Sequence, residues 1–132
     1  MQKVTALAFC LLLSSCAVFE GFGLMPSRSA EVSVSRGQTA SNVFTCVERT
    51  IIGLSKTRST WATSVTRKDE KSGIFETGNY GESNVIGFRV RAIYSTGDQK
   101  IRLKLKGAGP YYSDIGVDEG IEKLASGIKQ CV

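Results

Sequence analysis

The sequence predicts an α+β fold: an antiparallel four-stranded meander with an N-terminal and a C-terminal helix packed on one face. Two patterns predict it. In the middle of the chain apolar and polar residues alternate, most clearly from Ile86 to Tyr94, as in strands with one buried face. Before and after that region apolar residues recur at steps of three and four, as on one side of a helix. We therefore expect the two helices to cover the same side of the sheet.

The first elements are a short strand and a helix. A brief alternation over residues 31–35 leaves room for a fifth, N-terminal edge strand. The first helix is expected over residues 39–55 because apolar side chains recur there at helical spacing. Its apolar face comprises Val43, Cys46, Val47, Thr50 and Leu54.

The strands come next. Four are expected, within residues 60–66, 74–77, 86–94 and 101–106. Polar or glycine-containing turns separate them at 69–73, 78–81 and 95–98. Because each turn is short, consecutive strands should pair antiparallel.

The last element is a second amphipathic helix. It should begin near Asp114, whose side chain is suited to cap a helix N-terminus. Its apolar positions follow steps of four and three: Val117, Ile121, Leu124, Ile128 and Cys131.

The first residues have the pattern of an export signal. Lys3 precedes an apolar run from Val4 to Leu13, which is about half the roughly 20 residues that a membrane-spanning helix needs. The run ends in Leu13-Ser14-Ser15-Cys16, which resembles the lipobox of bacterial lipoproteins. A plain secretory signal, with Cys16 near its cleavage point, is the alternative interpretation.

The chain thus resembles small uncharacterised bacterial lipoproteins that carry a compact α+β domain behind a lipobox. That resemblance implies a signal peptide at 1–15, a lipid-anchored tether at 16–37 and a single domain at 38–132. It also implies acyl chains on Cys16 that attach the protein stably to a membrane. Since Ala17 replaces the aspartate that marks retention in the inner membrane, the resemblance implies a periplasm-facing outer-membrane lipoprotein.

The remaining cysteines are expected to pair. If Cys10 leaves with the signal and Cys16 carries lipid, only Cys46 and Cys131 are left. Two thiols in an oxidising compartment favour a disulfide, which would join the first helix to the last. Two buried free thiols are the alternative.

Composition limits the partners and the chemistry. The chain has 132 residues, a formal net charge of +5 and no histidine. Outside the cytoplasm such a charge suits anionic lipids or acidic proteins and disfavours nucleic acid. The lack of histidine and of closely spaced cysteines argues against a metal site. No nucleophile and base are suitably spaced, so we expect neither an enzyme nor a cofactor.

Cations follow the polar positions of the last two strands. The candidate face for an anionic partner comprises Arg89, Arg91, Arg102 and Lys104. A two-residue turn centre at 96–97 would place Arg91 opposite Arg102. It would also place Arg89 opposite Lys104, so that like charges face one another. A solvated outer face and a docking face both remain open interpretations.

One loop is a second candidate. Residues 107–112 combine glycine with Tyr111 and Tyr112, either as a partner-binding loop or as a connection whose rings pack at the end of the sheet. Taken together, these features favour a non-enzymatic outer-membrane lipoprotein that contributes to envelope structure or assembly by binding protein. The alternatives are binding of an anionic lipid or glycan by the basic face, and inhibition of, or immunity to, a lytic enzyme.

Overall fold

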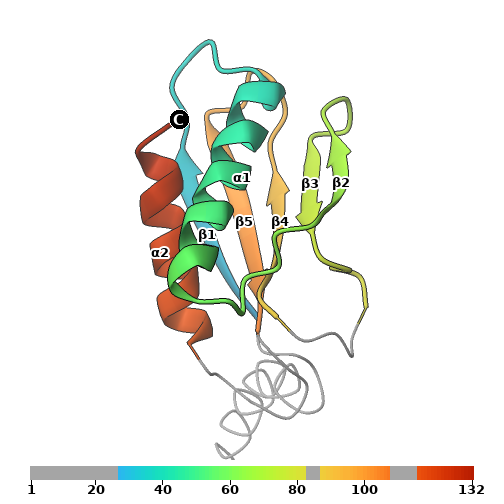
Figure 1. Cartoon of the computed structure of the whole chain (residues 1–132). Coiled ribbons are helices and arrows are strands. Elements are labelled where there is room, and N and C mark those ends of the chain that lie inside the picture. The colour runs from blue at the N-terminus through green and yellow to red at the C-terminus, as the bar shows by residue number, and fades with distance from the viewer. Residues whose placement is uncertain (1–26, 83–86, 108–115) are drawn as a thin grey trace, which may run out of the picture.

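The computed structural model describes residues 27–82, 87–107 and 116–132 of the chain. It confirms the predicted α+β class, with a five-stranded antiparallel sheet and two helices (Figure 1). In chain order the elements are β1 (Ser27–Ser33), α1 (Ala40–Thr57), β2 (Val65–Asp69), β3 (Ile74–Thr77), β4 (Arg89–Ile93), β5 (Lys100–Lys106) and α2 (Val117–Lys129).

The sheet contains the predicted meander and the fifth strand. Its order is β1-β5-β4-β3-β2, so that β2 to β5 pair consecutively and β1 adds to the free edge of β5. Every pairing is antiparallel. Strand β1 begins earlier than the 31–35 alternation, and its residues lie within the 16–37 segment expected as a tether. Residues 27–33 therefore belong to the folded domain.

Both helices lie on one face of the sheet, as expected (Figure 1). Helix α1 begins after Thr39, whose hydroxyl accepts a hydrogen bond from the Asn42 N–H at 3.1 Å. Helix α2 begins after Gly116, and the expected cap Asp114 lies outside the described residues. Asp118 and Glu119 occupy its first turn, where negative charge is favourable.

The core lies between the helices and the sheet. The alternation predicted for the two central strands is confirmed there, with Ile86 outside the described residues. The buried side chains from this region are Phe88, Val90, Ala92, Tyr94, Ile101, Leu103 and Leu105. Helix α2 approaches β5 closely, because a Cβ atom at Gly120 would lie 2.9 Å from Leu105 Cδ2. A larger residue at this position would push the helix off the sheet.

A disulfide joins Cys46 to Cys131, as predicted, with a Cα–Cα distance of 5.9 Å. Cys46 is buried on the apolar face of α1, whereas Cys131 is exposed just after α2. The bond therefore connects the first helix to the last residues of the chain.

The pairing of β4 with β5 differs from the prediction by two residues. Arg91 lies opposite Lys104 rather than Arg102, and Arg89 lies opposite Lys106 rather than Lys104. Since a shift of two preserves the alternation of faces, the cations still leave the sheet on the predicted side. Like charges still lie opposite one another.

The shift arises beside the turn. The expected turn does form, since the Asp98 N–H donates to the Ser95 carbonyl at 2.9 Å. However, the Tyr94 N–H donates to the Gly73 carbonyl, away from β5. On the β5 side, three residues (99–101) lie between this turn and Arg102, the first residue that pairs with β4. On the β4 side, Tyr94 is the single residue between the turn and Ile93, the partner of Arg102.

Candidate functional site

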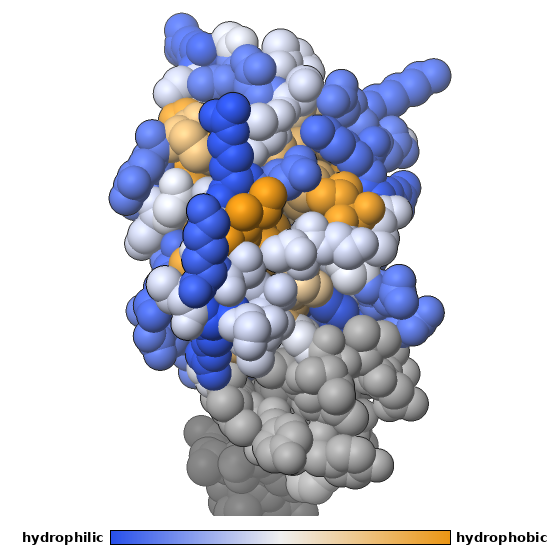
Figure 2. All heavy atoms as spheres, in the orientation of Figure 1, coloured by the Kyte–Doolittle hydropathy of each residue, from blue (hydrophilic) through white to orange (hydrophobic). Residues whose placement is uncertain are grey.

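The two faces of the sheet differ in what covers them. Figure 2 views the molecule from the side that carries the helices, where hydrophilic side chains surround small hydrophobic areas. The opposite face, called here the outer face, carries the predicted cations. Its outward side chains on β4 and β5 are Arg89, Arg91, Ile93, Lys100, Arg102, Lys104 and Lys106.

Arg89 is not available to a partner, contrary to the prediction. Its side chain is 0% exposed because the turn that follows β3 folds over it. The guanidinium Nη1 donates to the Asn79 carbonyl at 2.9 Å and to the Glu82 carbonyl. Its Nε and Nη2 are buried and have no hydrogen-bond partner in the part of the chain that the structure describes. Burial lowers the pKa of this guanidinium, although it still carries its charge at neutral pH.

Tyr80, from the same turn, lies between two cations. The Arg91 guanidinium carbon is 4.3 Å from the centre of the Tyr80 ring, and Lys106 Nζ is 4.4 Å from it. Both distances fit cation–π contacts. The tyrosine is 3% exposed, and its hydroxyl is buried without a hydrogen-bond partner within residues 27–82, 87–107 and 116–132. We call Tyr80, Arg89, Arg91 and Lys106 the Tyr80 cluster.

Positive charge predominates in this cluster. Arg91 Nε donates to Glu76 Oε1 at 3.0 Å, but the same oxygen lies 3.7 Å from Arg67 Nη1. Burial lowers the pKa of Lys106, and repulsion from neighbouring cations, Arg89 first, lowers it further. Burial raises the pKa of the Tyr80 hydroxyl, which keeps its proton as a donor.

A shallow hollow crosses the middle of the outer face. We call it the outer-face groove, and it is lined by Ser29, Ala30, Glu31, Arg91, Ile93, Arg102, Leu103 and Lys104. The side chain of Ile93 is 40% exposed. Arg102 and Lys104 are exposed and form no ion pair within the described residues.

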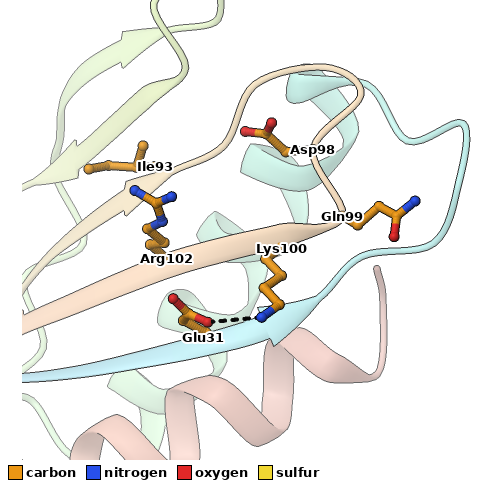
Figure 3. Close-up of a pocket in the computed structure, with 6 residues that line it drawn as sticks. All are labelled: Glu31, Ile93, Asp98, Gln99, Lys100 and Arg102. Carbon is orange, nitrogen blue, oxygen red and sulfur yellow. Dashed lines mark hydrogen bonds and ion pairs between the residues drawn. The ribbon is translucent and has the colours of Figure 1, made fainter.

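A second hollow adjoins this groove toward the β4–β5 turn. Figure 3 shows its lining, with Ile93 and Arg102 projecting from neighbouring strands. Glu31 on β1 and Lys100 on β5 form an ion pair there, with 3.4 Å between Oε2 and Nζ. The charges of Glu31 and Lys100 offset one another in this hollow. Arg102, beside Ile93, forms no ion pair within the described residues.

The predicted site residues fall into three groups. The structure brings Arg91, Arg102 and Lys104 together on the outer face, as predicted, and buries Arg89 beneath a turn. Tyr111 and Tyr112 lie outside the described residues, as does the lipobox with Cys16.

Sequence reasoning missed Tyr80 and the exposed Ile93. Tyr80 lies in a segment expected only as a turn, and no periodicity shows that a turn folds back over a sheet. The sequence does show Ile93 as an exception to the alternation, because it is an apolar residue at an outward position of the strand, where Arg89 and Arg91 are polar. A single exposed apolar residue is common on protein surfaces, so Ile93 bears on a contact surface only together with the hollow and the cations beside it.

The described residues contain neither a cluster of metal ligands nor a membrane-spanning helix. Within residues 27–82, 87–107 and 116–132, no three histidine, cysteine or acidic side chains lie together as metal ligands would. No helix in these ranges has the length and apolar character needed to cross a membrane.

Comparison of the chain with protein-family models, curated proteins and solved structures finds no match.

Proposed function

We propose that this protein is a non-enzymatic, lipid-anchored outer-membrane protein that contributes to envelope structure or assembly by binding another protein. Its binding surface is the outer-face groove. The observation that carries this proposal is the exposed Ile93 beside two cations, Arg102 and Lys104, that have no ion-pair partner in the described part of the chain.

The composition of the groove favours a protein partner. Protein interfaces combine a small apolar centre with a polar rim, and arginine is enriched in them. Ile93 supplies the apolar centre, while Arg102 and Lys104 supply charge on the β5 side. A matching partner presents an apolar side chain to Ile93 and carboxylates to the two cations. An anionic lipid or glycan would use the cations but gain little from Ile93.

The arrangement of the sheet makes this surface rigid. The groove residues come from β1, β5 and β4, which are paired along their lengths. A partner therefore meets a backbone that is already ordered, which lowers the entropic cost of association, although the exposed side chains of Arg102 and Lys104 are still ordered on binding.

The proposed anchor limits the distance between the membrane and the folded domain. With lipid on Cys16, ten residues separate the anchor from Ser27, the first residue of β1. A fully extended segment of ten residues spans at most about 35 Å. The groove therefore works close to the membrane surface, in the periplasm.

Reversing the charges of Arg102 and Lys104 tests whether the outer-face groove is the binding surface. The variant Arg102→Glu/Lys104→Glu should lose the protein recovered with the wild-type chain after crosslinking of intact envelopes, by about ten-fold or more, because the carboxylates of the partner would then be repelled. The measurement is quantitative mass spectrometry of the co-purified proteins.

The control carries the same change of charge elsewhere. Arg36→Glu/Lys71→Glu alters two exposed residues in loops away from the groove and should recover the partner at the wild-type level. Equal recovery from both double variants would refute the groove as the binding surface. Recovery of lipid instead of protein, lost only in the first variant, would favour the anionic-lipid alternative.

Replacing the lipidated cysteine tests the anchor. Cys16→Ser should move the protein from the membrane pellet to the soluble fraction or leave it unprocessed, since two or more acyl chains are what hold such a protein stably. Fractionation and the mass of the product measure this. Cys10→Ser, within the same leader, should remain attached to the membrane. Unchanged attachment of Cys16→Ser would show that the lipobox interpretation is wrong.

A further inference from the structure

We propose that the Tyr80 cluster is a binding site for a small oxyanion, most simply a phosphate group. This site is separate from the outer-face groove, although Arg91 borders both. It does not depend on the proposed protein partner.

The fold brings the donors of this site together. Arg89 and Lys106 lie directly opposite one another on β4 and β5, and Arg91 lies two residues further along β4. The turn after β3 then places the Tyr80 ring against Arg91 and Lys106, with Lys106 Nζ also donating to the Tyr80 carbonyl. Three cations and one phenol from three segments therefore share one corner of the outer face.

The deeper groups of the cluster lack hydrogen-bond partners. Nε and Nη2 of Arg89 are buried without an acceptor among the described residues, and so is the hydroxyl of Tyr80. Buried polar groups are nearly always hydrogen-bonded, and a buried guanidinium with two of its nitrogens unpaired is costly. All the unmet groups can act as donors. Together they leave positive charge and unmet donor capacity beneath the more accessible Arg91 and Lys106.

The charge of the cluster calls for an anion. Among the described residues, Glu76 is shared between Arg91 and Arg67, and the negative charge of Glu82 also acts on Arg89, so that the three cations of the cluster still outnumber the carboxylates near them. Burial is the main cause of the lowered pKa of Lys106, and repulsion from Arg89, Arg91 and Lys104 lowers it further, in agreement with this excess of positive charge. A phosphate group supplies both negative charge and several acceptors, and arginine binds it with parallel hydrogen bonds.

The outer edge of the cluster can be reached from solvent. The Arg91 side chain is 38% exposed, and that of Lys106 is partly exposed. An anion meets these two cations first, and the charge of Arg89 beneath them strengthens its binding because little water screens it there.

Calorimetric titration of the full chain, in a Cys16→Ser form that needs no membrane, tests this site. Inorganic phosphate is added at constant ionic strength in chloride. We expect saturable binding by this protein. Lys106→Gln should weaken it about ten-fold or more, because a hydrogen bond to a charged group is lost. Tyr80→Phe, which removes only the hydroxyl, should weaken it less.

Lys100→Gln is the matched control. It removes the same charge from the same strand and the same face, about 20 Å away at 3.3 Å per residue. Its affinity for phosphate should equal that of the unmodified chain. Absence of saturable phosphate binding, or equal affinities for Lys106→Gln and Lys100→Gln, would overturn the proposal.

A second experiment distinguishes a lipid head group from free phosphate as the ligand. The same proteins are sedimented with phosphatidylcholine vesicles that contain or lack phosphatidic acid, whose head group is a phosphomonoester. Binding to acidic vesicles that Lys106→Gln abolishes would identify a lipid head group as the ligand. Binding of inorganic phosphate alone would identify a free phosphate. Neither result depends on Arg102 and Lys104, so that failure of the groove and failure of this site are distinguishable.

Discussion

Replacing Cys46 and Cys131 together by serine is expected to lower the free energy of unfolding by about 4 to 5 kcal/mol. The two cysteines are 85 residues apart in the sequence. Opening so long a loop returns much conformational entropy to the unfolded chain. For a domain of this size the loss is a large part of the total stability. Urea unfolding of the full chain in the Cys16→Ser background measures it.

Reductant provides the control for this prediction. It should destabilise the Cys16→Ser protein by a similar amount and leave the variant without Cys46 and Cys131 unchanged. A difference below about 1 kcal/mol between oxidised and reduced protein would contradict the chain-entropy argument for this fold.

Replacing Phe75 by alanine is expected to cost about 3 to 5 kcal/mol. Phe75 on β3 is completely buried, and its ring centre lies 5.6 Å from that of Phe44 on α1. The substitution leaves a cavity between the sheet and the helix, which the surrounding backbone fills only in part. Urea unfolding in the same background measures the loss.

Ile93→Ala is the matched change on the outer face. Ile93 occupies the strand next to Phe75 but is 40% exposed, so its truncation should change the free energy of unfolding by about 0.5 kcal/mol or less. A loss near that of Phe75→Ala would mean that Ile93 serves the core and would remove the apolar centre of the proposed groove. A small loss keeps Ile93 available for a partner.

The fold follows from local patterns. Alternation over 86–94 and 101–106 identified the two central strands and the face that each residue occupies, because side chains in a strand have a period of two. Apolar residues at steps of three and four identified both helices, because side chains at that spacing lie on the same face of a helix. The disulfide was predicted because Cys46 and Cys131 are the two cysteines left once Cys10 is assigned to the leader and Cys16 to the lipid, and their places on the apolar faces of the two helices agreed with it.

Register and burial on the outer face did not follow from these patterns. The exact pairing of β4 with β5 depends on residues 99–101, which lie between the turn and the first β5 residue paired with β4 and carry no pattern that predicts this length. Likewise Arg89 is at an outward position, yet a turn containing Asn79 and Tyr80 covers it. Periodicity assigns a side chain to a face but does not show what else packs on that face.

The most direct test of the proposed function is photocrosslinking from Ile93 in intact envelopes. A photoreactive amino acid replaces either Ile93 in the groove or Ile52 on α1, which is similarly exposed at 41%. If the outer-face groove binds a protein, the Ile93 position should give one dominant protein adduct that the Ile52 position does not. Absence of an adduct from Ile93, or the same adducts from both positions, would contradict it.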